Sequence, residues 1–409
     1  MDPWLVALAA TVGERIREEV LDGDWTLPDF SVSRGASGLA MFFGALHKWD
    51  PAKGWDRCAH RSLLAAVQIF SETDRPPFGL FDGIAGLAFA ARYVAGTSRN
   101  YTGLLADLDD ILLEHVSGIL REDALSAVHS TRGIDLISGA SGIGVYLSSF
   151  GPQAARREGA RNLADYIARV FLDMGEGAGW PTYPAYIRHD RLREQFPDGF
   201  FDCGVAHGQP GVLGYLSIAE TSTYTQAAIA SGLTWLSECA IADNAGINWP
   251  VGKGIAGFAD STSIPSRAGW CYGAPGIARV LDLAGTTLKN GRATELAKEA
   301  ISAVCRRSQK LRRIDSPILC HGLSGLGVIC LAFAKGGALS GEMKAELVEI
   351  AQAVGRHFDP GSRFGFCDLR AGQSVDDPAL LVGAAGVGAF LLFAGVGLDP
   401  DFGRMFLIN

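Results

Sequence analysis

Two kinds of apolar stretch alternate along the chain. The first kind is apolar on nearly every side and directly follows a Gly-x-x-Gly pair, as in residues 142–147 and 386–393. The second kind is amphipathic: in residues 344–358, apolar positions such as Leu347 and Val354 share one helical face, and charged residues occupy the others. A helix that is apolar all round needs protein on every side, whereas an amphipathic helix can face water. The pattern therefore predicts alternating buried and surface helices.

The Gly-x-x-Gly pair is an internal repeat that occurs seven times, with first glycines 48 to 69 residues apart. That spacing fits two helices and their connections. The simplest architecture is all-α: an α,α toroid in which seven inner helices are ringed by seven outer helices. An open superhelix is the alternative, although it would expose the inner helices along one surface. The pairs are Gly35/Gly38, Gly83/Gly86, Gly139/Gly142, Gly208/Gly211, Gly273/Gly276, Gly322/Gly325 and Gly383/Gly386.

The repeat spans the chain, so we expect a single toroid domain over residues 1–409. The two longest spacings, 69 and 65 residues, indicate an insertion at about 175–204. This segment is rich in aromatic residues, is punctuated by prolines and directly precedes His207. It is interpreted either as a wall of a substrate cleft or as a packed surface loop.

Composition narrows the function classes. Glycine accounts for 52 of 409 residues, well above the usual share of ~7%. We interpret most of the repeated glycines as positions where helix starts approach neighbouring backbone closely. A phosphate-binding loop is the alternative, but neither a Gly-x-Gly-x-x-Gly nor a P-loop pattern accompanies them. The net charge of −8 argues against a nucleic-acid partner.

The sequence disfavours export and membrane insertion. The N-terminus has no basic region ahead of an apolar core, so no signal peptide is expected. Residues 379–398 are uncharged and long enough to cross a membrane, but acidic flanks and five glycines favour a buried helix. The eight dispersed cysteines are typical of a reducing compartment. We therefore expect a cytoplasmic protein that is not an integral membrane protein.

Two repeats carry metal-ligand residue types at the same point. Cys271 lies two residues before Gly273, and Cys320 lies two residues before Gly322, with His321 beside it. If the inner helices converge, equivalent positions in adjacent repeats converge as well. Two thiolates and an imidazole suit Zn²⁺ and leave the fourth tetrahedral position open, as in catalytic zinc sites. The alternative is two buried cysteines and a core histidine.

With these motifs the chain resembles the lanthionine synthetase C-like family, the lanthipeptide cyclases. The resemblance rests on Trp270-Cys271-Tyr272-Gly273, Cys320-His321-Gly322, Ala206-His207-Gly208 and the seven glycine pairs, and so covers nearly the whole chain. It implies an α,α toroid, one zinc ion held by Cys271, Cys320 and His321, and further site residues. One departure is visible: the family pattern favours Asn-Leu-Gly where this chain has Asp202-Cys203-Gly204. Cys203 is interpreted as a packing residue or an auxiliary thiol.

The resemblance also implies a reaction, in which a peptide Cys thiol adds to dehydroalanine or dehydrobutyrine and forms a (methyl)lanthionine thioether. Zinc would hold the substrate sulfur as a thiolate. His207 would act as general acid, and Arg267 would stabilise the enolate oxygen. Asp135 would orient His207 or raise its pKa. Tyr272 is the next candidate for the proton donor. The alternatives are a structural ion pair of Arg267 with Asp135 and a hydrogen-bonding role for His207 at a helix start.

The implied substrate is a dehydrated precursor peptide, leader plus core, with a dehydratase and an exporter as candidate partners. An enzyme that adds glutathione to dehydroamino acids would use the same residues and remains an alternative. A peptide-binding scaffold of a biosynthetic complex is the non-enzymatic alternative. A toroidal glycoside hydrolase would need two facing carboxylates, for which Asp82 and Asp135 are candidates, but would leave the cysteines and His321 unexplained.

Overall fold

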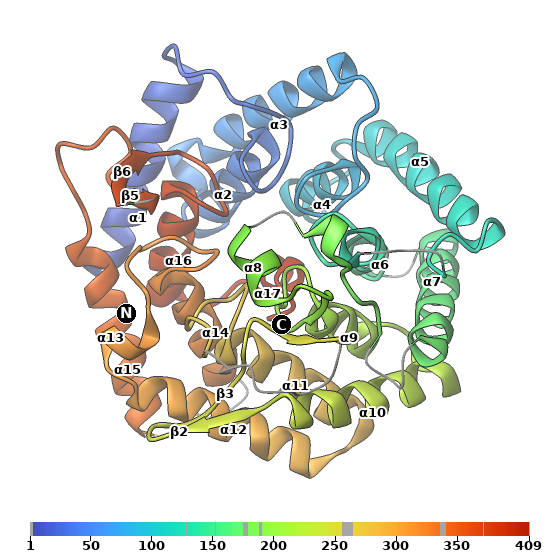
Figure 1. The fold of residues 1–409 in the computed structure, drawn as a ribbon. Coiled ribbons are helices and arrows are strands. Elements are labelled where there is room, and N and C mark those ends of the chain that lie inside the picture. The colour runs from blue at the N-terminus through green and yellow to red at the C-terminus, as the bar shows by residue number, and fades with distance from the viewer. Residues whose placement is uncertain are drawn as a thin grey trace. The chain divides into compact units, whose positions relative to one another are not determined.

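The computed structural model describes residues 3–126, 130–151, 153–174, 179–187, 190–255, 265–335, 341–370 and 372–408. Within them the chain is mostly helical, with three small two-stranded sheets (Figure 1). The chain forms two compact units, one of residues 1–109 with 313–409 and one of residues 110–312. Each unit is described by itself below.

Buried and surface helices alternate along both units, as the hydrophobic pattern predicts. Each buried helix begins directly after the first glycine of a pair and contains the second: α2 (Ala36–Trp49), α4 (Ile84–Ala95), α6 (Ala140–Leu147), α9 (Gln209–Ile218), α11 (Ala274–Leu288), α14 (Leu323–Lys335) and α16 (Ala384–Val396). The long amphipathic helices are α1 (Pro3–Ile16), α3 (Trp55–Glu72), α5 (Thr102–Arg121), α7 (Ala154–Asp173), α10 (Thr223–Glu238), α12 (Gly291–Arg306) and α15 (Gly341–Arg356).

Short elements complete the two units. The short helices are η1 (Arg17–Leu21), η2 (Pro51–Lys53), η3 (Thr131–Gly133), η5 (Pro184–Tyr186), α8 (Asp190–Gln195), α13 (Gln309–Arg312) and α17 (Pro400–Met405). The strands pair antiparallel: β1 (Phe200–Asp202) with β4 (Gly252–Gly254), β2 (Ile241–Asp243) with β3 (Gly246–Asn248), and β5 (Cys367–Arg370) with β6 (Gln373–Asp376). None of the helices in the described ranges has the length and apolarity needed to cross a bilayer. The uncharged stretch 379–398 contains the buried helix α16.

Six of the buried helices, α2, α4, α6, α9, α11 and α16, have a glycine at the N-cap position and no side-chain hydrogen bond capping their first turn. Their first N–H groups instead donate to carbonyls of the preceding loop, as Ala36 N does to Asp29 O and Gly38 N does to Ser31 O. The loop thus satisfies backbone donors that a helix start leaves unpaired. The carbonyls lie so close that a Cβ added at Gly35 would be 2.1 Å from Asp29 O. A side chain at this position would therefore push the loop off the helix end.

The loops ahead of the glycine pairs are also joined to one another within each unit. In the first unit Cys320 N donates to Leu381 O, Leu381 N to Ser33 O, and Ser33 N to Phe81 O. These bonds link the last glycine repeat to the first. In the second unit Val205 N donates to Cys271 O. In both units the residues just before a glycine pair therefore gather at one place, which explains how residues far apart in sequence meet there.

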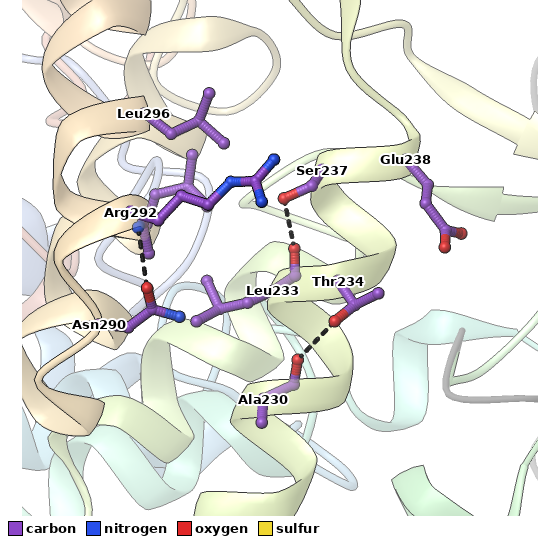
Figure 2. Close-up of a pocket in the computed structure, with 10 residues that line it drawn as sticks. Ala230, Leu233, Thr234, Ser237, Glu238, Asn290, Arg292 and Leu296 are labelled. Carbon is purple, nitrogen blue, oxygen red and sulfur yellow. Dashed lines mark hydrogen bonds between the residues drawn. The ribbon is translucent and has the colours of Figure 1, made fainter.

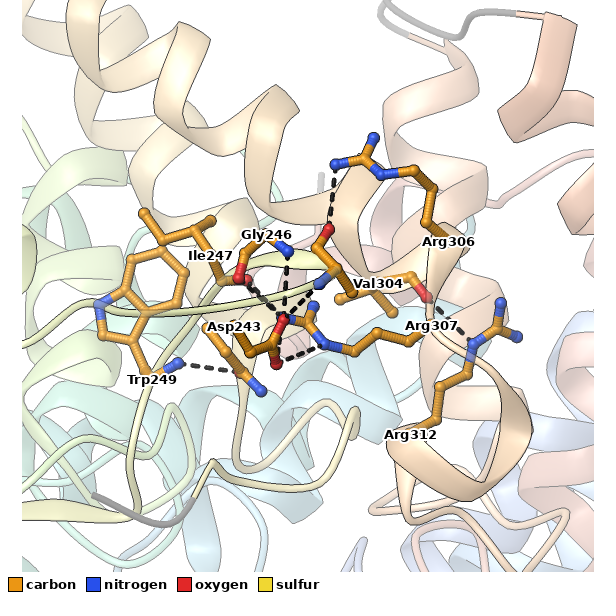
Figure 3. Close-up of polar contacts among 10 residues, drawn as sticks. Asp243, Gly246, Ile247, Trp249, Val304, Arg306, Arg307 and Arg312 are labelled. Carbon is orange, nitrogen blue, oxygen red and sulfur yellow. Dashed lines mark hydrogen bonds and ion pairs between the residues drawn. The ribbon is translucent and has the colours of Figure 1, made fainter. Parts of the chain in front are cut away.

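Two features of the second unit lie outside these loops. The β2–β3 hairpin is fixed by the buried Arg307, which follows α12 and donates to the carboxylate of Asp243 and to the carbonyls of Gly246 and Ile247 (Figure 3). A surface groove of about 520 Å³ lies between α10 and α12, with Leu233 and Leu296 among its apolar lining and Arg292 and Glu238 among its charged residues (Figure 2).

Candidate active site

A tight turn places Cys271 ahead of α11. Gly269 N donates to Tyr272 O across the turn, and Gly273 has a φ of +111°. A Cβ at Gly273 would lie 1.8 Å from Arg267 O, so only glycine fits both the dihedral angle and the space. Cys271 itself is buried. The Trp-Cys-Tyr-Gly motif therefore reflects a backbone constraint as well as a chemical one.

Cys320 and His321 lie in the corresponding loop ahead of α14. The backbone of Cys320 is held by its hydrogen bond to Leu381 O. His321 Nε2 lies 3.9 Å from Oδ1 of Asp368, a buried carboxylate on β5. Asp368 in turn accepts hydrogen bonds from Ser316 Oγ and Arg370 Nε. His321 thus lies beside a fixed buried carboxylate, an arrangement typical of metal-binding histidines.

The side chains of Cys271, Cys320 and His321 each offer one ligand atom, and these atoms lie within 4.8 Å of one another. Atoms bound to one zinc ion, at the Zn–S distance of ~2.3 Å and the Zn–N distance of ~2.0–2.1 Å, lie at most about twice these distances apart, and the separations here are close to that limit. Two sulfurs and an imidazole nitrogen are soft-to-borderline donors that suit zinc better than magnesium or calcium. The donor set therefore fits the predicted metal in number, chemistry and spacing.

His207 and Asp135 lie in the loops ahead of α9 and α6. Nδ1 of His207 is 2.7 Å from Oδ2 of Asp135, whose side chain is fully buried. The other oxygen of Asp135 accepts from Ser138 N and Gly139 N, which fixes the carboxylate. Because an ionised carboxylate only accepts, Nδ1 carries the proton and Nε2 is left for another partner. Burial lowers the pKa of His207, but the hydrogen bond and charge of Asp135 outweigh it and hold this pKa above its usual value.

Asp202 is a further titratable residue at this place, and the sequence did not identify it as functional. The side chain is buried at the end of β1, and burial raises the pKa of its carboxyl to about 6. Gly204 N donates to Oδ1 at 2.7 Å, and the hydroxyl of Tyr272 donates to Oδ2 at 2.8 Å. Burial, followed by the charge of Asp202, raises the pKa of Tyr272 well above its ordinary value. The signal that could have revealed Asp202 is its acidic side chain in an otherwise apolar segment directly before His207.

The structure gives less support for a chemical role of Arg267 and Cys203 than for the residues above. Arg267 is exposed, and no hydrogen bond or ion pair of its side chain is present within the described ranges, so its role at the enolate remains a prediction. Cys203 is fully buried, and a hydrogen bond with Cys239, together with burial, raises the pKa of its thiol well above normal. These properties favour packing over a reactive auxiliary thiol.

The insertion is described for residues 179–187 and 190–204; residues 175–178 and 188–189 lie outside the described ranges. Trp180 is fully buried and donates to Leu125 O, and Thr182 pairs with Phe200. Ile187, Phe196 and Phe200 form a small apolar cluster of their own. The insertion is therefore packed directly onto β1, the strand that ends at Asp202.

Comparisons with known proteins agree with this geometry. Residues 27–405 match the family described as lanthionine synthetase C-like protein. The nisin biosynthesis protein NisC of Lactococcus lactis subsp. lactis is 25% identical over 325 residues, which are 75% of this chain and 74% of that protein. The solved structure of a nisin cyclase superposes with a TM-score of 0.78 at 20% identity, covering 99% of this chain and 96% of that one. The likeness confirms the predicted all-α, α,α-toroid fold, and the chain belongs to the lanthionine synthetase C-like family.

Proposed function

We propose that the protein is a lanthipeptide cyclase, which adds Cys thiols of a dehydrated precursor peptide to dehydroalanine or dehydrobutyrine to form (methyl)lanthionine rings. Family membership alone would also fit a scaffold that binds the peptide. The observation that favours an enzyme is the grouping of Cys271, Cys320 and His321 within 4.8 Å. A scaffold has no need of a three-ligand group with an open fourth position.

The metal we propose is one Zn²⁺ per chain, held by Cys271, Cys320 and His321. Bound there, zinc would lower the pKa of the substrate thiol so that the sulfur is available as a thiolate at neutral pH. Asp368 supports this assignment, because its buried carboxylate lies 3.9 Å from Nε2 of His321, and carboxylates commonly lie beside metal-binding histidines and orient them.

The proposed acid is His207. Addition of a thiolate to the β-carbon moves an electron pair onto the carbonyl oxygen of the dehydroamino acid, and the α-carbon of this enolate must then gain a proton. Asp135 holds the Nδ1 proton, so Nε2 is the nitrogen that can deliver a proton to the substrate. The raised pKa keeps more of His207 protonated near neutral pH. The lost thiol proton restores the imidazolium, so the proton balance of the addition closes. Arg267 is proposed to stabilise the enolate oxygen.

The packed insertion before His207 is proposed to wall the substrate cleft, because it ends with the strand β1 that leads into the site.

Residues 1–409 are proposed to act as one domain. A dehydratase that prepares the peptide and an exporter that removes the product are the partners we propose, and the cytoplasm is the proposed location.

The test is incubation of the protein with a chemically or enzymatically dehydrated precursor that retains its cysteines. Thiol alkylation followed by mass spectrometry counts the free thiols, since ring closure removes alkylation sites without changing the mass of the peptide. We expect alkylation to be lost with the protein and retained without it. A second arm contains glutathione and a dehydrated peptide whose cysteines are replaced by alanine. A mass increase of one glutathione in that arm, without ring closure in the first, would assign intermolecular addition instead.

A further inference from the structure

The loop from Asp202 to Gly208 contains His207 and is also hydrogen-bonded to the segment around Cys271. Val205 N and Ala206 N both donate to the carbonyl of Cys271, at 2.8 and 3.3 Å. Two side-chain contacts to the next residue, Tyr272, accompany these bonds and lie within the same unit. Tyr272 therefore contacts the loop that carries His207 and directly follows the proposed metal ligand Cys271. Its orientation affects the positions of both.

The ring of Tyr272 lies directly on the backbone of Gly204. A Cβ added at Gly204 would be 2.5 Å from Cε1 of the ring and 2.7 Å from Cζ, closer than real Cβ contacts allow. Gly204 has no positive φ, so its conformation does not require glycine. Glycine is required at position 204 because the Tyr272 ring occupies the space that a side chain would fill.

The hydroxyl of Tyr272 donates a hydrogen bond to the carboxylate of Asp202. A phenol has one proton, and an ionised carboxylate can only accept hydrogen bonds. Oδ1 of Asp202 is filled by Gly204 N–H, and Oδ2 receives the proton of Tyr272. The single proton of Tyr272 is therefore directed at Asp202.

We propose that Asp202 is a positioning residue that holds the Tyr272 hydroxyl with its proton turned away from the substrate, so that Tyr272 offers only lone pairs to the site. A peptide substrate supplies matching donors in its backbone N–H groups. Tyr272 is then a hydrogen-bond acceptor that helps to place the peptide, and the α-carbon proton comes from another group. This rests on the proposed function and replaces the expectation that Tyr272 is the next candidate for the proton donor.

The kinetic test compares Tyr272→Phe, Asp202→Asn and the double variant with the parent enzyme, each zinc-loaded. Loss of an acceptor that binds substrate raises KM and changes kcat little. We expect each single variant to raise KM about tenfold and to keep kcat within about tenfold, because one substrate hydrogen bond is lost. The double variant is expected to match Tyr272→Phe, because Asp202 acts through that hydroxyl.

Two kinetic outcomes would overturn the proposal. A fall in kcat of ~10²-fold or more in Tyr272→Phe would make Tyr272 a proton donor. Additive losses in the double variant would show that Asp202 acts independently of Tyr272. The matched control is Asp109→Asn, which also alters a buried carboxylate, one paired with Arg92 in the other unit. It should lower the thermal unfolding midpoint and leave kcat and KM unchanged.

A spectroscopic measurement tests the geometry without any turnover. In protein with ring-labelled tyrosine, a hydroxyl proton bonded to a buried carboxylate should give a separate, slowly exchanging NMR resonance. Tyr272→Phe assigns it, and Asp202→Asn should shift or abolish it. Absence of the resonance in the parent protein would refute the positioning role. Its presence in a protein that forms no thioether on any dehydrated peptide would refute the proposed function and leave the geometry standing.

Discussion

Nδ1 of His207 lies 2.7 Å from Oδ2 of Asp135, although 72 residues separate them in the sequence. Asp135 is fully buried, whereas 38% of the His207 side chain is exposed. The histidine is thus anchored on its buried side and open on the other. A general acid needs this combination, because it must be held in one orientation and still reach its substrate.

Asp135→Asn should move the pH dependence of catalysis. The carboxylate raises the pKa of His207, so a neutral amide lowers that pKa. A general acid acts while protonated, and activity declines as the pH rises through its pKa. We therefore expect the decline to begin at lower pH in Asp135→Asn, with lower activity at neutral pH. The measurement is kcat/KM between about pH 5 and pH 9. Asp190→Asn, on an exposed side chain of α8, is the control and should keep the parent profile.

Two variants distinguish the role of the proposed zinc site from that of the proposed general acid. Cys271→Ala should lose zinc and ring formation together, because two remaining ligands hold the metal poorly. His207→Asn should retain zinc and slow ring formation by ~10²–10⁴-fold. Elemental analysis and alkylation mass spectrometry on the same preparations give both readouts. Cys305→Ala removes a half-buried cysteine of α12 and should retain both. Loss of zinc from His207→Asn would mean that the histidine is a ligand or supports one.

Asp368→Asn should weaken metal binding without removing any ligand. Asp368 lies 3.9 Å from Nε2 of His321 and is held by Ser316 and Arg370. Changes to such supporting carboxylates cost ~10–100-fold in metal affinity. Competition with a chromophoric chelator measures the zinc affinity directly. Affinity equal to that of the parent protein would show that Asp368 serves only the β5–β6 region.

Gly204→Ala should destabilise the protein by about 1–3 kcal/mol, because the new methyl group overlaps the ring of Tyr272. The control is Gly291→Ala at the first position of α12, where a Cβ meets no atom within 4 Å. That change should be neutral or stabilise by about 0.4–1 kcal/mol. Chemical denaturation measures both free energies of unfolding. Equal stability of the two variants would mean that the Tyr272 ring can move away from Gly204 at no cost.

The helical repeat and the residue types of the site are predictable from the amino-acid sequence alone. Helical periodicity and the glycine pairs are local signals, since each reports on a few neighbouring residues and their burial. The burial of α16 follows from such signals, although the helix, Ala384–Val396, is shorter than the uncharged stretch 379–398. The position of Cys271, Cys320 and His321 just before buried helices follows from them as well. The motifs also sufficed to predict the family.

Which side chains contact one another depends on how the helices and loops pack. The contact of Tyr272 with Asp202 joins residues 70 positions apart, and its existence depends on how two helix-start loops pack. The same holds for the bonds of Arg307 to the β2–β3 hairpin, which no local pattern predicted. The direction of a hydroxyl proton or the pKa of a buried carboxyl depends on burial and on partners supplied by distant segments. The direction of this proton and the pKa of this carboxyl are set only in the folded chain, so they cannot be predicted from hydrophobic periodicity or motif spacing.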